Sequence, residues 1–417
     1  MRILKLTPKI EQRLLQARSQ RDGEAQRIAA RIIADVRKRG DAALHAWAKK
    51  LDGADLQGDG LWFSSQELRA ASMQVTKEFR RAIQHAARNI RTVARKQLPR
   101  SWTLEVEPGV QVSQLVRPID AVGCYIPGGR FALVSTLLMT VVPAKLAGVK
   151  RVVVVCPKPN AEVLYAAHSL GVTEVARIGG AQAIAALAYG TKSLARVDKI
   201  FGPGNRFVTA AKQLVSSDCA IDLPAGPTEA VVLAARGNPQ FVAADLLAQA
   251  EHAPDAGSFF VTTSRRLATQ VQRAVAEQVA NLRAENPARI SIEKCGAILL
   301  APSIVGACDF VNRFAPEHLS LPDSGNSLLK KITAAGTIFL GPLGAQPLGD
   351  YASGSNHVLP TGGWARSRAG LSSADFVKCI SVQSFHRRGF ASLAGDVITL
   401  ANAEGLVAHA QAVKVRQ

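Results

Sequence analysis

The chain has 417 residues, which is too long for one small module and predicts two or three domains. Its hydrophobic fraction of 47% and charged fraction of 20% are those of a globular protein, so disordered, collagen-like and mucin-like classes are excluded. Six cysteines lie far apart without a C-x-x-C pair, which excludes a Cys-rich zinc finger and fits a reducing compartment. No apolar run spans a bilayer and the N-terminus lacks an apolar signal core, so we expect a cytoplasmic protein with no membrane partner.

The net charge is the unusual feature of the composition. A total of 51 basic and 32 acidic residues gives +19, of which the first hundred residues contribute +12 through 22 basic and 10 acidic side chains. This excess fits either a surface for nucleic acid or another polyanion, or a solvated basic face. Neither aromatic platforms nor an RNA-binding motif accompanies the charge, so nucleic acid is the less favoured partner.

The N-terminal quarter is predicted to be helical. Apolar residues recur every three or four positions over residues 11–51 and 64–98, and the acidic, Gly-rich stretch LDGADLQGDG separates the two runs. Between Arg69 and Arg100 the basic residues also recur at helical intervals, interleaved with apolar ones. This pattern predicts an amphipathic helix with a basic outer face.

Two α/β blocks follow in tandem. From about residue 110 to 230, short β-branched strands alternate with Ala- and Leu-rich helices, as in STLLMTVVPAKLAG followed by RVVVVCPKP. A second series has helices at 238–253, from 264, and at 302–313, between strands such as GSFFVTTS and CGAILLA. The alternation predicts parallel sheets covered by helices. Beyond about residue 370 we expect helices with little core of their own, which must pack on the body or on a partner subunit.

The search for a nucleotide motif gives one imperfect match. GPGNRF at 202–207 follows a strand and opens a helix, but Phe207 stands where the third glycine of a dinucleotide fingerprint belongs. Such a turn places N–H groups where phosphate is favoured, although a turn without a ligand fits the spacing equally well. Neither a P-loop nor a G-x-S-x-G elbow occurs, so P-loop nucleotidases and the simplest serine hydrolases are unsupported.

Four polar groupings are candidates for chemistry. Gln249 and His252 lie three apart near the end of a helix and could share a cation, although a helical histidine is more often a surface residue. Glu317 and His318 precede a strand, where they could transfer protons or form an exposed charged turn. The other two groupings are a Gly-rich loop and a terminal helix, and their polar residues are Asp350, Tyr351, Ser355, Asn356, His357, Glu404 and His409. Each grouping is weak evidence alone.

Nine motifs together resemble the histidinol dehydrogenase family, in the order in which that family has them. The resemblance runs from about residue 20 to the end of the chain. Its motifs read GCYIPGGR, PAKLAGVKRVVVVCPKP, IGGAQAIAALAYGT, KIFGPGN, DLPAGPTEA, QAEH, FAPEHL, GDYASGSNHVLPTGG and EGLVAHA. The resemblance implies an enzyme that oxidises L-histidinol to L-histidine through bound histidinaldehyde, the last step of histidine biosynthesis. It also implies two NAD molecules per reaction, one zinc ion per subunit, and a homodimer with exchanged ends.

The fold implied by the resemblance is α/β, with two intertwined incomplete Rossmann-like domains of parallel sheet and small helical N- and C-terminal segments. We expect the following division: an N-terminal arm (1–13), a discontinuous first domain (14–118 and 229–371), a second domain (119–228) and a C-terminal helical tail on the partner subunit (372–417).

The resemblance also assigns residues to roles. The implied zinc ligands are Gln249, His252, Asp350 and His409, the last from the partner chain. Glu317 and His318 match the proton-transfer pair, with His318 as the base toward the hydroxyl and Glu317 activating water for the second oxidation. Glu404 matches an amine contact made across the dimer, and Thr228 and His357 match the substrate pocket, which the zinc ligands and His318 also line. Tyr125, Gln182 and Asn205 match contacts to NAD.

Two positions depart from the family pattern. Thr228 stands where the family usually has serine, and Gln346 stands where it usually has glutamate, so one negative charge near the substrate is missing. The loss weakens attraction for a cationic amino alcohol by about 1 kcal/mol or more in a dry site. A related dehydrogenase acting on another small alcohol, such as a sulfonated diol, therefore stays as an alternative, and the charge of +19 favours an anionic substrate. Retention of Glu404 argues against that alternative. A polyanion-binding protein with a lapsed active site is the third, less favoured interpretation.

Overall fold

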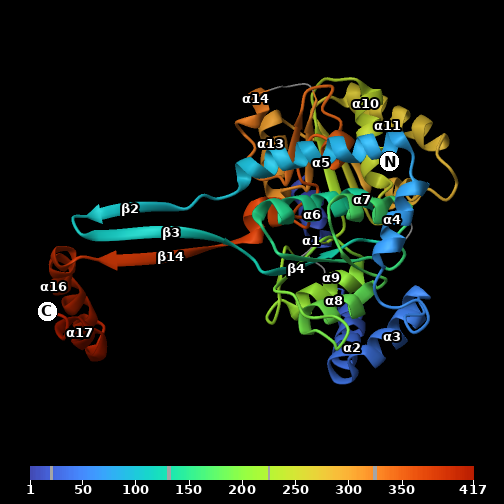
Figure 1. Ribbon diagram of the computed structural model, residues 1–417. Coiled ribbons are helices and arrows are strands. Elements are labelled where there is room, and N and C mark those ends of the chain that lie inside the picture. The colour runs from blue at the N-terminus through green and yellow to red at the C-terminus, as the bar shows by residue number, and fades with distance from the viewer. Residues whose placement is uncertain (19–21, 129–132, 224–225, 323–325) are drawn as a thin grey trace.

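The computed structural model describes residues 1–18, 22–128, 133–223, 226–322 and 326–417. Gly129 and Arg130 of the first motif, with Pro224 and Ala225 of DLPAGPTEA, lie outside these ranges. The described chain forms two parallel sheets, each covered by helices, and a long antiparallel ribbon that projects from the body (Figure 1). The α/β class with two Rossmann-like sheets is confirmed.

The smaller sheet has five parallel strands in the order β6-β5-β4-β7-β8. Its interior strands read as continuous apolar runs because helices cover both faces. The strands and their crossover helices are β4 (Ala121–Tyr125), α6 (Val134–Ala147), β5 (Arg151–Val155), α7 (Ala161–Ser169), β6 (Glu174–Ala176), α8 (Gly180–Tyr189), β7 (Lys199–Phe201), α9 (Arg206–Val215) and β8 (Ala220–Ile221).

The N-terminal helices complete the two faces of this smaller sheet. On one face α2 (Gly23–Arg39), α3 (Asp41–Trp47) and the π-helix Ala48–Asp52 share a core with α8 and α9. On the other face α4 (Ser65–Gln74) and α5 (Lys77–Gln97) share a core with α6 and α7. The expected domain division stays a prediction, and this packing favours assigning residues 23–97 to the lobe of the smaller sheet.

The larger sheet has six parallel strands in the order β1-β11-β10-β9-β12-β13, so the N-terminal strand forms one edge. Its helices α10, α11 and α12 cover one face, and α1 and α13 cover the other. The elements are β1 (Arg2–Lys5), α1 (Pro8–Arg18), β9 (Glu229–Leu233), α10 (Pro239–Ala250), β10 (Gly257–Thr262), α11 (Arg265–Ala280), α12 (Ala288–Lys294), β11 (Gly296–Leu300), α13 (Ile304–Phe314), β12 (His318–Leu321), α14 (Asn326–Leu329), β13 (Thr337–Leu340) and α15 (Gln346–Tyr351).

The projecting ribbon corrects the expectation that residues beyond about 370 are helical. Strand β14 (Val377–Phe385) pairs antiparallel with β3 (Val110–Pro118), which pairs antiparallel with β2 (Trp102–Glu107). Helices α16 (Arg387–Ala403) and α17 (Val407–Lys414) follow at its far end (Figure 1). The strand was missed because the strand it pairs with lies more than 250 residues away, and local periodicity carries no signal of such pairing.

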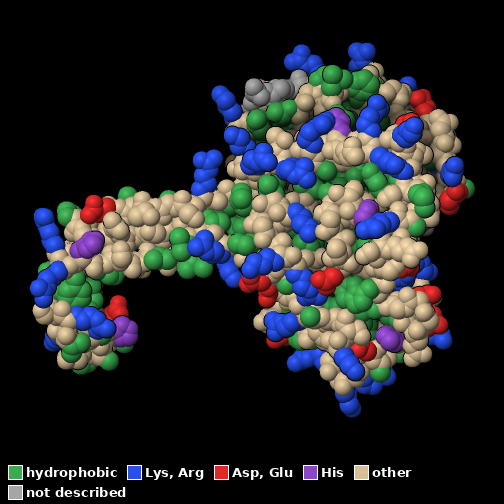
Figure 2. All heavy atoms as spheres, in the orientation of Figure 1, with side chains coloured by type: hydrophobic (Ala, Val, Ile, Leu, Met, Phe, Trp, Pro, Cys, Tyr) green, Lys and Arg blue, Asp and Glu red, His purple; other side chains and the backbone are tan. Residues whose placement is uncertain are grey.

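Helix α5 has the basic outer face predicted from the sequence. Its buried residues are mainly alanine and isoleucine, whereas Lys77, Arg81, Arg88, Arg91 and Arg95 are exposed. Figure 2 shows Lys and Arg side chains over the surface where this helix runs. Among the described residues, no helix has both the length and the hydropathy to cross a bilayer.

Candidate active site

The candidate catalytic residues lie at the amino edge of the larger sheet. Glu317 and His318 stand at the start of β12, and Thr228 directly precedes β9, the neighbouring strand. Helix α13 ends at Phe314, and the next residue, Ala315, adopts the left-handed conformation with φ of 46° immediately before Pro316. A non-glycine residue in this conformation stores backbone strain, which is typical of functional loops. The strained bend places Glu317 and His318 side by side at the sheet edge.

A chain of hydrogen bonds connects Glu317 to α15. Gln346 donates from Nε2 to Gln249 Oε1 at 2.6 Å, and Gln249 donates from Nε2 to Thr228 Oγ1 at 2.5 Å. The Thr228 hydroxyl in turn donates to Oε2 of Glu317, which also accepts from the backbone N–H of Glu229 at 3.0 Å. Gln249 and Gln346 are buried, so water is excluded from this series of hydrogen bonds. The series holds one carboxylate oxygen of Glu317 in place.

The imidazole of His318 lies between two carboxylates. Its Nε2 is 3.4 Å from Asp350 Oδ1, and its Nδ1 is 3.8 Å from Glu317 Oε2. Both ring nitrogens are buried without a hydrogen-bond partner among the described residues. Burial alone would lower the pKa of His318, but the charges of Glu317 and Asp350 outweigh it and raise the pKa above its ordinary value. A buried imidazole with two free nitrogens is suited to accept a proton from a bound molecule.

Two further histidines, His252 and His357, lie near Asp350. Nδ1 of His252 lies 3.0 Å from the carbonyl oxygen of Ala248, and Nδ1 of His357 lies 2.9 Å from that of Asp350. A carbonyl only accepts, so each Nδ1 carries the proton and each Nε2 keeps a lone pair. Burial would raise the pKa of Asp350, but the imidazoles of His318, His357 and His252 hold it below its ordinary value.

These groups fit a divalent cation such as zinc. The exposed His252 presents a free Nε2, because a backbone carbonyl fixes its other nitrogen in the way that metal-ligating histidines require. Asp350 supplies a carboxylate, and the amide oxygen of Gln249 keeps a second lone pair beside its bond to Gln346. Within the described ranges, no cluster of three or more His, Cys, Asp or Glu side chains could hold a metal. The described residues of one chain therefore do not form such a cluster by themselves.

Glu404 and His409 are not brought to this cluster within one chain. Glu404 follows α16 and His409 lies in α17, and both helices stand at the far end of the projecting ribbon (Figure 1). Both side chains are exposed. The structure therefore assembles Thr228, Gln249, His252, Glu317, His318, Asp350 and His357 near one another and leaves the remaining two apart.

The expected cofactor residues lie at the carboxyl edge of the smaller sheet. Strand order reverses between β4 and β7, because α6 and α7 cover one face and α8 and α9 the other. Ligands of open α/β sheets bind at such a switch point. Tyr125 ends β4, and Asn205 caps α9 just after β7, so both lie beside this switch point. Gly202 is required here because a Cβ would lie 2.2 Å from the carbonyl oxygen of Tyr125.

Gln182 is fully buried beside Tyr125. The Tyr125 hydroxyl accepts from Gly180 N at 3.2 Å, and Gln182 donates from Nε2 to Asp52 Oδ2 at 2.9 Å. Its Oε1 has no partner within the described part of the chain, which marks an acceptor able to take a bond from a ligand. Asp52 was missed by sequence reasoning, because a lone aspartate in a Gly-rich acidic stretch carries no local signal.

A second missed carboxylate supports the cofactor turn. Asp222 accepts from Gly202 N at 2.7 Å and pairs with Lys212 at 2.5 Å, and both charged side chains are buried. Lys212 also donates to the Gly202 carbonyl at 2.7 Å. The Lys212–Asp222 pair therefore holds both the N–H and the carbonyl of Gly202 in place. In the sequence, the feature that could have indicated Asp222 is its position in the motif DLPAGPTEA.

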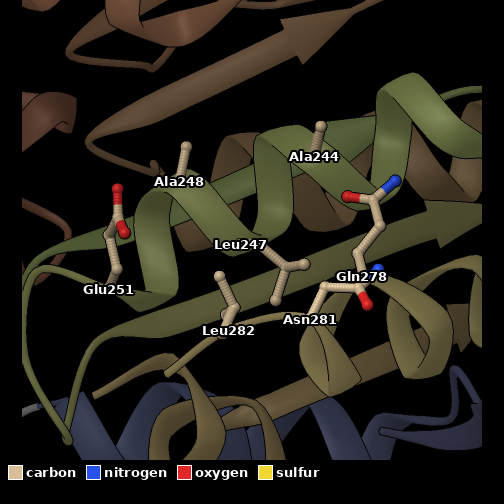
Figure 3. Close-up of a pocket in the computed structure, with 7 residues that line it drawn as sticks. All are labelled: Ala244, Leu247, Ala248, Glu251, Gln278, Asn281 and Leu282. Carbon is tan, nitrogen blue, oxygen red and sulfur yellow. The ribbon is translucent and has the colours of Figure 1, made fainter. Parts of the chain in front are cut away.

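Two hydrogen bonds join the Gly-rich loop of the larger lobe to helix α6 of the smaller lobe. His357 Nε2 lies 3.1 Å from the hydroxyl of Thr136 in α6, and Asn356 donates to the carbonyl of Met139 at 2.8 Å. The Gly-rich loop of the larger lobe is therefore bound to the helix that follows Tyr125 in the smaller lobe. A separate pocket between α10 and the end of α11 is lined by none of the expected site residues (Figure 3).

A topological switch point in one parallel sheet and a histidine flanked by carboxylates on the other are typical of a dehydrogenase. The family model of histidinol dehydrogenase matches residues 15–417. The chain is 47% identical over 396 residues to histidinol dehydrogenase of Methanothermobacter thermautotrophicus, covering 93% of this chain and 92% of the relative. It is 44% identical to that of Aquifex aeolicus, covering 94% and 93%. The crystal structure of histidinol dehydrogenase from Elizabethkingia anophelis superposes with a TM-score of 0.94 at 38% identity, covering 100% of this chain and 98% of that one. The chain belongs to the histidinol dehydrogenase family.

Proposed function

We propose that this protein oxidises L-histidinol to L-histidine in two successive two-electron steps, with NAD as the acceptor and zinc at Gln249, His252 and Asp350. The observation that carries the proposal is the buried, unpartnered imidazole of His318 between Glu317 and Asp350. A bound zinc supplies a Lewis acid that holds the amino alcohol in place, and NAD supplies the hydride acceptor.

The side chains of the site divide the proton transfers. His318 accepts the hydroxyl proton while the carbinol hydride leaves, and no existing hydrogen bond of its ring nitrogens has to break first. Glu317 is fixed through Oε2 by Thr228 and Glu229, which leaves Oε1 to take a proton from the water that hydrates the aldehyde. After it has released the first proton to solvent, His318 accepts the proton of the second oxidation. Gln182, Tyr125 and Asn205 would hold NAD at the carboxyl edge of the smaller sheet.

The functional unit in this proposal is a homodimer. The ribbon and its terminal helices expose many apolar side chains, including Trp102, Leu104, Ile380, Val382 and Phe385. An exposed apolar surface of this kind marks an interaction site, and a second copy of the chain covers it in our proposal. The exchanged ribbon would bring His409 of the partner subunit to the cation as its fourth ligand and Glu404 of the partner subunit to the substrate amine. The six unpaired cysteines support a reducing compartment.

The decisive experiment counts NADH formed per histidinol consumed, before and after treatment with a chelator. Two NADH per histidinol, abolished by the chelator and restored by zinc, is the expected result. No NADH from histidinol with zinc in place would contradict the proposal.

Gln346 supports a second candidate. Its amide stands, buried, where the family usually has a carboxylate, so one attraction for a cationic amino alcohol is missing. A sulfonated or otherwise anionic small alcohol is therefore the alternative substrate. Turnover of such a diol with a lower KM than that of histidinol would establish it.

A further inference from the structure

We propose that Arg18 is a positioning residue for the reaction, because its guanidinium ties the start of β9 to the end of α13 and thereby sets the place of Glu317. The inference rests on the proposed function, in which Glu317 activates water for the second oxidation. Arg18 is the last residue of α1, which packs on the larger sheet and precedes every family motif in the sequence.

One side of the guanidinium binds Glu229. Arg18 donates from Nε to Glu229 Oε2 at 2.6 Å and from Nη2 to Oε1 of the same carboxylate, which is the bidentate geometry that arginine favours. Glu229 is buried and also accepts from Gly362 N at 3.2 Å. Burial raises the pKa of Glu229 to about 7 even though Arg18 opposes the shift. The arginine therefore provides the compensating charge for this buried carboxylate.

The other side of the guanidinium binds the bend before Pro316. Arg18 donates from Nη1 to the carbonyl of Phe314, and its Nη2 lies 3.5 Å from the carbonyl of Ala315. The Cζ atom of Arg18 also lies over the Phe314 ring, 3.7 Å from the ring centroid. The last carbonyls of a helix have no partner within the helix, and Ala315 is strained, so these contacts stabilise an otherwise costly bend.

Glu317 depends on both of the tied segments. Its backbone follows the Ala315–Pro316 bend, whereas Oε2 of its carboxylate is bound by Thr228 and by Glu229 N at the start of β9. A change in the separation of the two segments would break these bonds or turn the carboxylate. Near-attack geometry tolerates little displacement, so such a shift should slow the step that uses Glu317 more than the step that does not.

The test compares Arg18→Ala with Arg13→Ala, an exposed arginine on the same helix, in the zinc-loaded full-length protein. In single turnover with histidinol we expect Arg18→Ala to form the first NADH at nearly the wild-type rate. The second NADH should form about tenfold to a hundredfold more slowly, with release of histidinaldehyde and a KM within about twofold. Arg18→Lys keeps the charge without the bidentate fork and should lie between wild type and Arg18→Ala.

Two outcomes would overturn the proposal. Equal slowing of both oxidations in Arg18→Ala would indicate a structural role alone, and an unchanged second oxidation would indicate no role. If Arg18→Ala fails to fold, the rates of the two oxidations are compared in Arg18→Lys and Arg13→Ala instead.

Hydrogen exchange without substrate tests the positioning independently of the reaction. Backbone amides of residues 311–321 should exchange faster in Arg18→Ala than in Arg13→Ala and wild type. Equal exchange would contradict the proposal that Arg18 holds the bend before Pro316. If wild type does not oxidise histidinol, the proposed function fails, whereas this measurement still decides whether Arg18 holds the bend.

Discussion

Gln346 donates a hydrogen bond from Nε2 to Oε1 of Gln249, with 2.6 Å between the two atoms, and both side chains are buried. A glutamate at position 346 could only accept, so Gln249 would have to present its NH2 group to it and turn its oxygen elsewhere. The residue at position 346 therefore decides which way the Gln249 amide faces. The orientation matters because the amide oxygen is the atom that a cation would bind.

The first prediction follows from this relationship. Gln346→Glu restores a negative charge and frees the oxygen of Gln249, so we expect the KM for histidinol to fall about tenfold, equivalent to about 1.4 kcal/mol. Steady-state kinetics and zinc content by metal analysis check the prediction. Thr228→Ser, the other departure from the family pattern, is the control and should leave KM within about twofold. An unchanged or higher KM in Gln346→Glu would favour a different natural substrate.

The second prediction concerns the hydroxyl that joins Gln249 to Glu317. Thr228→Val keeps the shape of the side chain but leaves the Gln249 amide and Glu317 Oε2 without their shared partner. We expect kcat to fall about tenfold to a hundredfold, since a lost hydrogen bond to a charged group costs about 1.5–3 kcal/mol. Thr228→Ser retains the bond and should stay close to wild type. Equal activity of the two variants would show that the hydroxyl is dispensable.

Local pattern was sufficient for part of the fold and site. The α5 helix, the strand in RVVVVCPKP and the placement of Glu317 and His318 where a strand begins follow from periodicity and neighbouring prolines. Strand β14 and the hydrogen bond from Gln182 to Asp52 join segments about 260 and 130 residues apart, respectively. Such contacts depend on how the lobes pack, and a sequence without an alignment does not encode them in any single stretch.

The third prediction tests the shared site by complementation. In the proposed dimer, His252→Ala would damage the body half of a site and His409→Ala the ribbon half, so each variant alone should lose zinc and activity. In a hybrid dimer with exchanged ribbons, one site receives both damaged halves and the other receives none. Co-expression should therefore restore about a quarter of wild-type activity when chains pair at random. Zinc per hybrid dimer, measured after affinity separation, should approach one. Absence of any recovery would mean that His409 acts within its own chain or not at all.

The fourth prediction uses Asp245, on α10 one turn before Gln249. Burial alone raises the pKa of Asp245 from its ordinary value to about 6. Between about pH 4 and pH 6 the folded protein keeps a proton that the unfolded chain has released, so stability falls as pH rises through this window. Asp245→Asn removes the penalty and should be more stable than wild type by about 1–2 kcal/mol at pH 7.5, allowing for partial exposure, and equal to it near pH 4. Thermal unfolding at both pH values checks the prediction, with Asp309→Asn on the exposed face of α13 as a control that should show the same small difference at each pH. A stability gain in Asp245→Asn that is as large at pH 4 as at pH 7.5 would show that ionisation of this carboxyl is not its cause.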